Sequence, residues 1–286
     1  MNVKEFDEDL LEMYECRKSF FVDDMTYIQS HRSKIRWDLG PIFKERVIEG
    51  HDEICGMYVS EAVAVCVATQ VEGPNPGLQG IAKIRMQIPN PGRIATAPVR
   101  ASTRCGFELY NLRQLSRLGC TCTPKLLDTA WSVQDENDPV PGGFCAFFIM
   151  EKLPGHNLNN FGALPMAERN QIRLSFAKSI REFYDLRYDH DDPARRNLIW
   201  DSEKKKCYII DLEEAYEILD ADKPRAFSPE LHWRDWGIAG PESSTSYYGL
   251  DPMVPHHKKY IENPSDEMLE KMAADAEGRD VLMPSR

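Results

Sequence analysis

The stretch that decides the fold runs from Tyr188 to Glu217 and reads YDHDDPARRNLIWDSEKKKCYIIDLEEAYE. Its first ten residues hold a histidine, three aspartates, two arginines and Asn197. The segments LIW and CYII then flank the polar turn DSEKKK, which predicts a short hairpin that ends at Asp211. An acid before the hairpin, an amide five positions later and an acid after the hairpin can therefore converge on one place.

The three side chains in question, Asp192, Asn197 and Asp211, suit a site for a magnesium nucleotide. Mg²⁺ takes one or two carboxylate or amide oxygens together with substrate phosphates. The remaining acid is then available to accept a proton from an attacking hydroxyl. A solvated turn with an aspartate or asparagine cap is the alternative that these residues alone leave open.

The first half of the chain predicts an α+β unit. Apolar residues among charges indicate a helix over roughly 7–32, and β-rich patterns indicate strands at 62–68 and 81–88. A helix is predicted over 102–119. Two further strands are predicted, at 125–133 and 144–150.

The second half begins at the turn signal Leu153-Pro154-Gly155, which we interpret as a hinge. A helical pattern covers 166–187. Past Glu217 the chain is rich in proline, glycine, tryptophan and charge, which predicts an irregular tail. Trp233 and Trp236 in this tail are expected to cover the core, with a stacking wall for a ligand as the alternative.

Composition excludes several classes of partner. The formal net charge of -11 and the absence of a basic block argue against nucleic acid. No apolar run approaches the ~20 residues that span a bilayer, and the acidic N-terminus is unlike a secretory signal, so we expect no membrane partner and a cytoplasmic protein.

Of eight cysteines only Cys120 and Cys122 are close together. Without a second pair or a nearby histidine this is poor zinc spacing, which favours buried or free thiols.

The sequence His190-Asp191-Asp192, with Asn197 five positions after Asp192 and Asp211-Leu212-Glu213 beyond, resembles the protein-kinase-like superfamily. Protein kinases use H-R-D-x-x-x-x-N followed by D-F-G. The aminoglycoside phosphotransferase and choline kinase branch, which this chain resembles more, uses H-G-D-x-x-x-x-N followed by D-x-E or D-x-D.

The resemblance implies a bilobal fold and a site for ATP and Mg²⁺. The expected parts are a helical N-terminal extension at 1–45, a strand-rich N-lobe at 46–152, and a smaller, mainly helical C-lobe with an irregular tail at 153–286. By the same resemblance Asp192 is the catalytic base, and His190 braces the loop. Asn197 and Asp211 are the Mg²⁺ ligands.

The first half of the chain offers the remaining parts of that template. Lys83 occupies the place of the lysine that contacts the phosphates, and Glu108 that of its glutamate partner on the following helix. Backbone groups near Glu151 to Leu153 are expected to hold the adenine. In CGMYVSEAV, the expected phosphate-covering loop, Gly56 and the Ser60 hydroxyl are the candidate groups.

Three departures from the family pattern stand out. Asp191 replaces a glycine or an arginine and adds a second carboxylate to the loop. The expected phosphate loop is not rich in glycine. Glu213 replaces the glycine of D-F-G, which removes backbone freedom after Asp211.

The sequence favours a phosphotransferase that uses ATP and Mg²⁺ and acts on a hydroxyl of a small molecule. The first alternative is a kinase-like pseudoenzyme, a scaffold that binds a nucleotide or a protein partner. The second is an atypical protein kinase; it is disfavoured because no A-P-E motif appears and only 73 residues (286 minus 213) follow Glu213, which leaves little room for a peptide platform. The acceptor and the oligomeric state are not indicated by the sequence.

Overall fold

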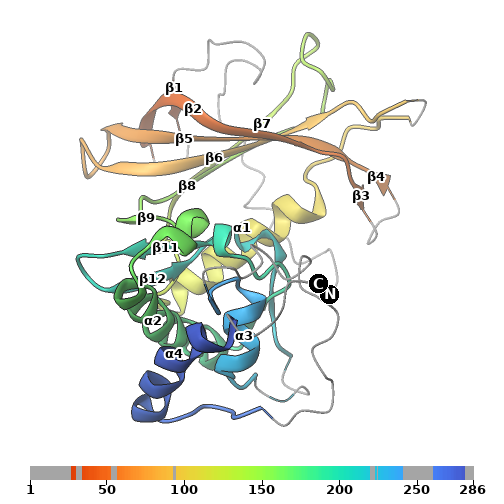
Figure 1. Cartoon of the computed structure of the whole chain (residues 1–286). Coiled ribbons are helices and arrows are strands. Elements are labelled where there is room, and N and C mark those ends of the chain that lie inside the picture. Colours follow the sequence, from red (N-terminus) through yellow and green to blue (C-terminus); the bar gives the residue numbers. More distant parts are fainter. Residues whose placement is uncertain are drawn as a thin grey trace. The chain divides into compact units, whose positions relative to one another are not determined.

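The computed structural model describes residues 27–29, 34–52, 57–92, 95–219, 223, 225–240 and 260–280. The chain divides into two compact units. The first consists of residues 1–113 and 125–152, and the second of residues 114–124 and 153–286. Figure 1 labels the four α-helices of the described residues and most of the strands.

The first unit is built on a six-stranded antiparallel sheet with the strand order β1-β2-β5-β6-β8-β7. A two-stranded hairpin, β3-β4, lies between β2 and β5 along the chain. The bounds of these strands are β1 Tyr27–Gln29, β2 Arg36–Ile48, β3 His51–Asp52, β4 Met57–Tyr58, β5 Ser60–Glu72, β6 Gln79–Ile88, β7 Leu126–Val133 and β8 Phe144–Glu151. Helix α1 (Thr103–Arg117) follows β6.

The strands predicted at 62–68, 81–88, 125–133 and 144–150 are all present, as β5, β6, β7 and β8. Strand β6 shows why alternation was a reliable signal. Its apolar residues Ala82, Ile84 and Met86 are buried on one face, while Lys83 and Arg85 alternate with them on the other. The helix predicted over 102–119 is also present, as α1.

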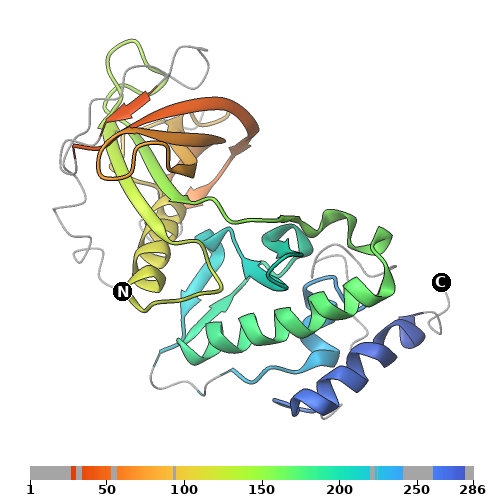
Figure 2. The ribbon, with the colours of Figure 1, turned by 90° about the vertical axis from the view of Figure 1, so that its left-hand side faces the viewer.

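The sheet is strongly curled (Figure 2). The indole nitrogen of Trp37 on β2 donates a hydrogen bond to Asp128 on β7 at 3.0 Å, although three strands separate β2 from β7 in the sheet. In a flat sheet these two strands would lie about 19 Å apart at the usual strand spacing. The bond therefore requires the two sides of the sheet to turn toward each other.

The helical N-terminal extension expected at 1–45 is wrong where the structure describes it. Tyr27–Gln29 form β1 and the residues from Arg36 onward form β2, and the rest of the predicted helix lies outside the described residues. The Gly40-Pro41 step falls inside β2. Irregular pairing between Leu39 and Ile42 accommodates the proline, which has no N–H to donate to the ladder.

The second unit contains a long helix, α2, and several short strands. The predicted hairpin is present as β11 and β12, and the helix predicted over 166–187 is present as α2. The bounds are β9 His156–Asn157, η3 Leu158–Ala163, α2 Met166–Asp185, β10 Tyr188–His190, η4 Arg195–Asn197, β11 Leu198–Asp201, β12 Lys206–Ile209, η5 Leu212–Glu214, β13 Ala215–Glu217, α3 Pro229–Asp235 and α4 Asp266–Asp280. The strands pair as β12-β11-β9 and β10-β13.

The tail after Glu217 is not irregular throughout, which corrects the prediction. Helix α4 lies beside α2 (Figure 2) and buries Leu269 and Ala273, which are four residues apart and so share one face. Two apolar residues among charges are a weak helical signal in the sequence. Trp233 and Trp236 are buried, as expected of residues that cover the core.

Among the helices of the described residues, none combines the length and the apolar character that crossing a bilayer requires.

Gly155, in the turn before β9, provides a test of the β9–β11 pairing. A Cβ atom at this position would lie 2.0 Å from the carbonyl oxygen of Trp200, and the backbone φ is +98°. Backbone strain alone should lower the free energy of unfolding of Gly155→Ala by about 1–3 kcal/mol. The collision with the main chain should add to that loss. Gly119→Ala is the control in the same unit, since its φ is +74° with no atom within 4 Å.

The measurement is urea unfolding of both variants and the wild type. Equal losses in the two variants would contradict the collision with Trp200, because only the backbone strain is common to both.

Candidate functional site

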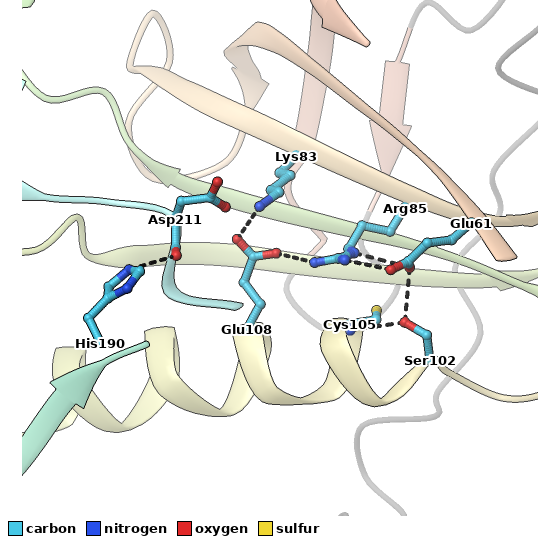
Figure 3. Close-up of polar contacts among 8 residues, drawn as sticks. All are labelled: Glu61, Lys83, Arg85, Ser102, Cys105, Glu108, His190 and Asp211. Carbon is cyan, nitrogen blue, oxygen red and sulfur yellow. Dashed lines mark hydrogen bonds and ion pairs between the residues drawn. The ribbon is translucent and has the colours of Figure 1, made fainter. Parts of the chain in front are cut away.

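The predicted site residues fall into two clusters, one in each unit. The first, called the lysine cluster, consists of Glu61, Lys83, Arg85, Ser102 and Glu108. Lys83 and Arg85 are two positions apart on β6 and so point to the same face of the sheet. Helix α1 presents Glu108 to that face (Figure 3).

Glu108 binds both cations of β6 with its two carboxylate oxygens. Oε1 accepts a hydrogen bond from Lys83 Nζ at 2.6 Å, and Oε2 accepts one from Arg85 Nη1 at 2.6 Å. All three side chains are buried. The structure thus brings together Lys83 and Glu108, which the sequence had paired, and adds Arg85, which the sequence had not singled out.

Glu61 on β5 holds the other side of the Arg85 guanidinium. It accepts from Arg85 Nη2 at 2.6 Å and from Nε at 3.2 Å, a two-point contact with one carboxylate. Ser102 donates its hydroxyl to Glu61 at 2.9 Å and accepts the backbone N–H of Cys105 at 3.0 Å. Ser102 therefore caps the start of α1 and connects that cap to the sheet.

The lysine cluster is balanced in charge, with two carboxylates and two cations. Burial alone would lower the pKa of Arg85, but Glu61 and Glu108 outweigh it and hold that pKa well above the usual value. A buried ion pair adds little net stability, whereas removing one partner leaves a costly unpaired charge. The cluster therefore fixes how α1 lies on the sheet.

Three other predicted positions have their own surroundings. Ser60 is fully buried at the start of β5, where its N–H donates to Asn90 Oδ1 at 3.2 Å, so its hydroxyl is not presented to solvent. The backbone N–H of Glu151 donates to the carbonyl of Lys125 at 2.8 Å and is engaged within the sheet. Leu153 is the first residue of the second unit after β8.

The second cluster, called the loop cluster, consists of His190, Asp192, Arg196, Asn197 and Asp211. His190 is buried, and its Nδ1 accepts the backbone N–H of Asp192 at 3.1 Å. That bond makes Nε2 the protonated nitrogen, which donates to the carbonyl oxygen of Asp211 at 3.1 Å (Figure 3). One imidazole thus links the two predicted acids through their backbones.

Burial lowers the pKa of His190, against the opposing effect of Asp211 and Asp192. The ring is therefore neutral at pH 7, as its two hydrogen bonds require. Trp236 packs edge-on against it at 5.4 Å between ring centroids, a role that the sequence did not reveal. Through these two hydrogen bonds and the contact with Trp236, His190 holds the loop in place.

Asp192 is held by two neighbours. Arg196 Nη2 donates to its carboxylate at 2.6 Å, and Asn197 Nδ2 donates to its Oδ2 at 3.0 Å and to its carbonyl at 2.9 Å. Because Asn197 uses its amide nitrogen here, its amide oxygen is the atom left to bind a cation. Amide oxygens and carboxylates are the ligands that Mg²⁺ takes.

Asp211 adopts a left-handed backbone conformation, with φ 64° and ψ 61°. The β11–β12 ladder places it, because the N–H of Ile210 donates to the carbonyl of Asn197 at 2.9 Å. Its carboxylate extends away from the carbonyl that His190 holds (Figure 3). A non-glycine residue in this region is uncommon and is often found where a side chain must be aimed.

A pocket of about 240 Å³ adjoins the loop on the side of Asp191 and Pro193. Tyr184, Asp189 and Asp235 are among the residues that line it. Burial raises the pKa of Asp235 to about 7, and its Oδ1 has no hydrogen-bond partner. Burial and the charge of Asp189 also raise the pKa of Asp191.

The lysine cluster yields a prediction about Arg85. Replacing it with methionine leaves the buried Glu61 carboxylate without a cation, and we expect the free energy of unfolding to fall by about 3–5 kcal/mol. The double variant Glu61→Gln/Arg85→Met should recover part of that loss, since it restores the charge balance. Arg36→Met is the control, because the Arg36–Glu72 pair is exposed and worth about 0–1 kcal/mol.

Urea unfolding followed by tryptophan fluorescence measures these differences. The account of the lysine cluster would be wrong if Arg85→Met lost no more stability than Arg36→Met.

The pocket beside the loop yields a prediction about Asp235. Its pKa is higher in the folded protein, about 7, than the ordinary value of 3.8, so the stability it contributes is complete below pH 4 and lost as the pH rises to 7. We therefore compare the free energy of unfolding of Asp235→Asn with that of the wild type. The difference in favour of the variant should grow from pH 5 to pH 7, by up to about 1 kcal/mol per pH unit, and should stay constant above pH 7.

The comparison of two proteins at each pH cancels the contribution of His190, which both retain. Unfolding free energies at pH 5, 6, 7 and 8 supply the measurement. A difference that stays constant from pH 5 to 7 would show that Asp235 is not the titrating group.

No protein-family model matches the chain, and no curated protein sequence matches it. The chain is similar to a solved structure, that of the Cydia pomonella granulovirus kinase PK-1, with 16% sequence identity and a TM-score of 0.36. The alignment covers 61% of this chain and 53% of the viral kinase, so the chain spans about half the length of that protein.

Proposed function

We propose that the chain is a phosphotransferase that uses ATP and Mg²⁺ to phosphorylate a hydroxyl group of a small molecule. The observation that carries this proposal is the loop cluster, in which one neutral histidine fixes the backbones of Asp192 and Asp211 while Asn197 holds the carboxylate of Asp192. Two acids and an amide gathered in this way match the needs of metal binding and proton transfer.

In this mechanism Asn197 and Asp211 would hold Mg²⁺, which would offset charge on the transferring phosphoryl group. Asp192 orients the acceptor hydroxyl and takes its proton. Arg196 pairs with Asp192 but is about half exposed, so it can turn away at a small energetic cost.

Lys83 would supply a further positive charge for the phosphates of a nucleotide. Glu108 binds the ammonium group of Lys83, and Arg85 keeps Glu108 in position. Positioning and electrostatic stabilisation are nearly all that a protein contributes to phosphoryl transfer. We further infer that the chain has a kinase-like fold, of the branch that includes aminoglycoside phosphotransferases and choline kinases.

A small acceptor is favoured over a peptide by the pocket beside Asp191. Its volume of about 240 Å³ and its residues, which all belong to the second unit, suit a compact molecule rather than an extended chain.

A scaffold that binds a nucleotide without turnover is the second candidate, favoured by one observation. Arg196 and Asn197 both donate to the carboxylate of Asp192, so an acceptor hydroxyl must compete with them for the carboxylate oxygens. If Arg196 stays in place when a nucleotide binds, binding without transfer follows.

Thermal unfolding with nucleotides tests the binding step. We expect ATP with Mg²⁺ at 100 times the dissociation constant to stabilise the wild type by about 2.7 kcal/mol, and we expect little effect without Mg²⁺. Asp211→Asn should lose this gain because a metal ligand is weakened. Asp185→Asn, an exposed aspartate at the end of α2, is the matched control and should keep it.

GTP takes the place of ATP in a parallel series. No stabilisation by either nucleotide, or an equal gain in Asp211→Asn, would remove the support for a nucleotide site.

A turnover assay separates the enzyme from the scaffold. We expect Asp192→Ala to retain stabilisation by the magnesium nucleotide but to lose about 10²–10⁴-fold in the rate of ADP formation with an alcohol acceptor, because the general base is gone. The assay is a screen of small alcohols with ADP as the readout. Turnover in Asp192→Ala at the wild-type rate would contradict the role of Asp192, and binding without turnover in the wild type would favour the scaffold.

A further inference from the structure

The segment between α1 and β7 contains a pair of buried thiols that phosphotransfer does not use. Cys120 and Cys122 are 1% and 0% exposed, and their sulfur atoms lie 3.4 Å apart. Both belong to the second unit. Two thiols so close, with one residue between them, present two ligand atoms to the same point.

A third ligand atom comes from α2. The ligand atoms of Cys120, Cys122 and Glu182 all lie within 4.8 Å of one another. Thr121 donates its N–H to Oε1 of Glu182 and its hydroxyl to Oε2 at 2.8 Å, which fixes the carboxylate beside the sulfurs. Each oxygen that accepts one hydrogen bond keeps a further lone pair for a metal ion.

The spacing agrees with the geometry of a thiolate metal site. Two sulfurs bound to one tetrahedral Zn²⁺ at ~2.3 Å lie about 3.8 Å apart, so the two thiols need to separate by only a few tenths of an ångström. Hydrogen bonds from a neighbouring residue to a ligand carboxylate are a common support of such sites. Thr121 already provides them.

We propose that Cys120, Cys122 and Glu182 form a binding site for a thiophilic divalent cation of the zinc class, with water as the fourth ligand. Glu182 is half-buried, so the side of the site that it forms is the one open to solvent. Two thiolates and one carboxylate carry three negative charges, against which the cation brings two positive charges. Lys206 adds a further positive charge nearby, since its Nζ donates to the hydroxyl of Thr121 at 2.9 Å.

The other described cysteines lack this arrangement. Cys66 and Cys207 are single buried thiols, and burial raises the pKa of both. Among the described cysteines, Cys120 and Cys122 alone place their sulfur atoms beside each other and beside a carboxylate.

A cation at this place would join three parts of the second unit. It would bind α2 through Glu182 and the 120–122 segment through both sulfurs. That segment is already connected to β12, because the carbonyl of Cys122 accepts the N–H of Ile209 at 2.8 Å. The site would therefore fasten the strand that leads to Asp211, and its existence does not depend on the proposed phosphotransferase activity.

The test uses the full chain, freshly reduced and freed of metal by a chelator. Zn²⁺ is titrated by calorimetry, and Cd²⁺ is followed by the ultraviolet charge-transfer band of cadmium thiolate. X-ray absorption of the zinc form counts the sulfur ligands. The variants are Cys120→Ser/Cys122→Ser and Glu182→Gln, with Cys66→Ala as the control.

We expect one Zn²⁺ per chain with two sulfurs at ~2.3 Å, and a rise in the unfolding temperature on binding. The double variant should lose the cadmium band, and Glu182→Gln should bind at least about tenfold more weakly. Cys66→Ala should bind as the wild type does. Circular dichroism establishes that each variant is folded.

Three results would overturn the proposal. They are no binding of Zn²⁺ or Cd²⁺ by the reduced wild type, binding that survives in the folded double variant, and a disulfide between Cys120 and Cys122 that persists under reductant.

Discussion

The carboxylate of Glu108, shared between Lys83 and Arg85, is the constraint on which the first unit depends. A helix that carries a buried carboxylate is restricted to the orientation in which that charge meets its cations, because an unpaired buried charge costs several kcal/mol. Arg85 also binds Glu61, and the hydroxyl of Ser102, at the start of α1, donates to Glu61. One network therefore sets the position of the helix, the cap of the helix and the extension of Lys83.

In the second unit a neutral side chain has the equivalent role. His190 accepts from the backbone of Asp192 and donates to the backbone of Asp211, and both bonds require the ring to be uncharged. Burial keeps it so. The two units thus hold their polar side chains in position in different ways. Balanced charges do this in the lysine cluster, and one tautomer of a buried neutral histidine does it in the loop cluster. In both cases the groups with functional potential are fixed by neighbours before any ligand arrives.

Local patterns in the sequence predicted much of this fold. The alternation in β6 and the hairpin of β11 and β12 are properties of a few adjacent residues, and they were predicted correctly. Contacts between distant residues were not predictable in the same way. Nothing near Arg85 in the sequence indicates that Glu61 will hold it, and nothing near Cys120 points to a carboxylate on α2. Strand β2, which contains a glycine-proline step, and the charged helix α4 were missed because tertiary packing outweighs a weak local signal.

The proposal that Lys83 contacts the phosphates of a bound nucleotide is tested most directly by an ATP analogue with a reactive acyl phosphate, which acylates a lysine next to the phosphates. Mass spectrometry of the labelled protein identifies the lysine. We predict acylation of Lys83 that excess ATP with Mg²⁺ suppresses and that Asp211→Asn strongly reduces. Labelling of other lysines only, or labelling of Lys83 that neither competitor nor mutation affects, would contradict the account.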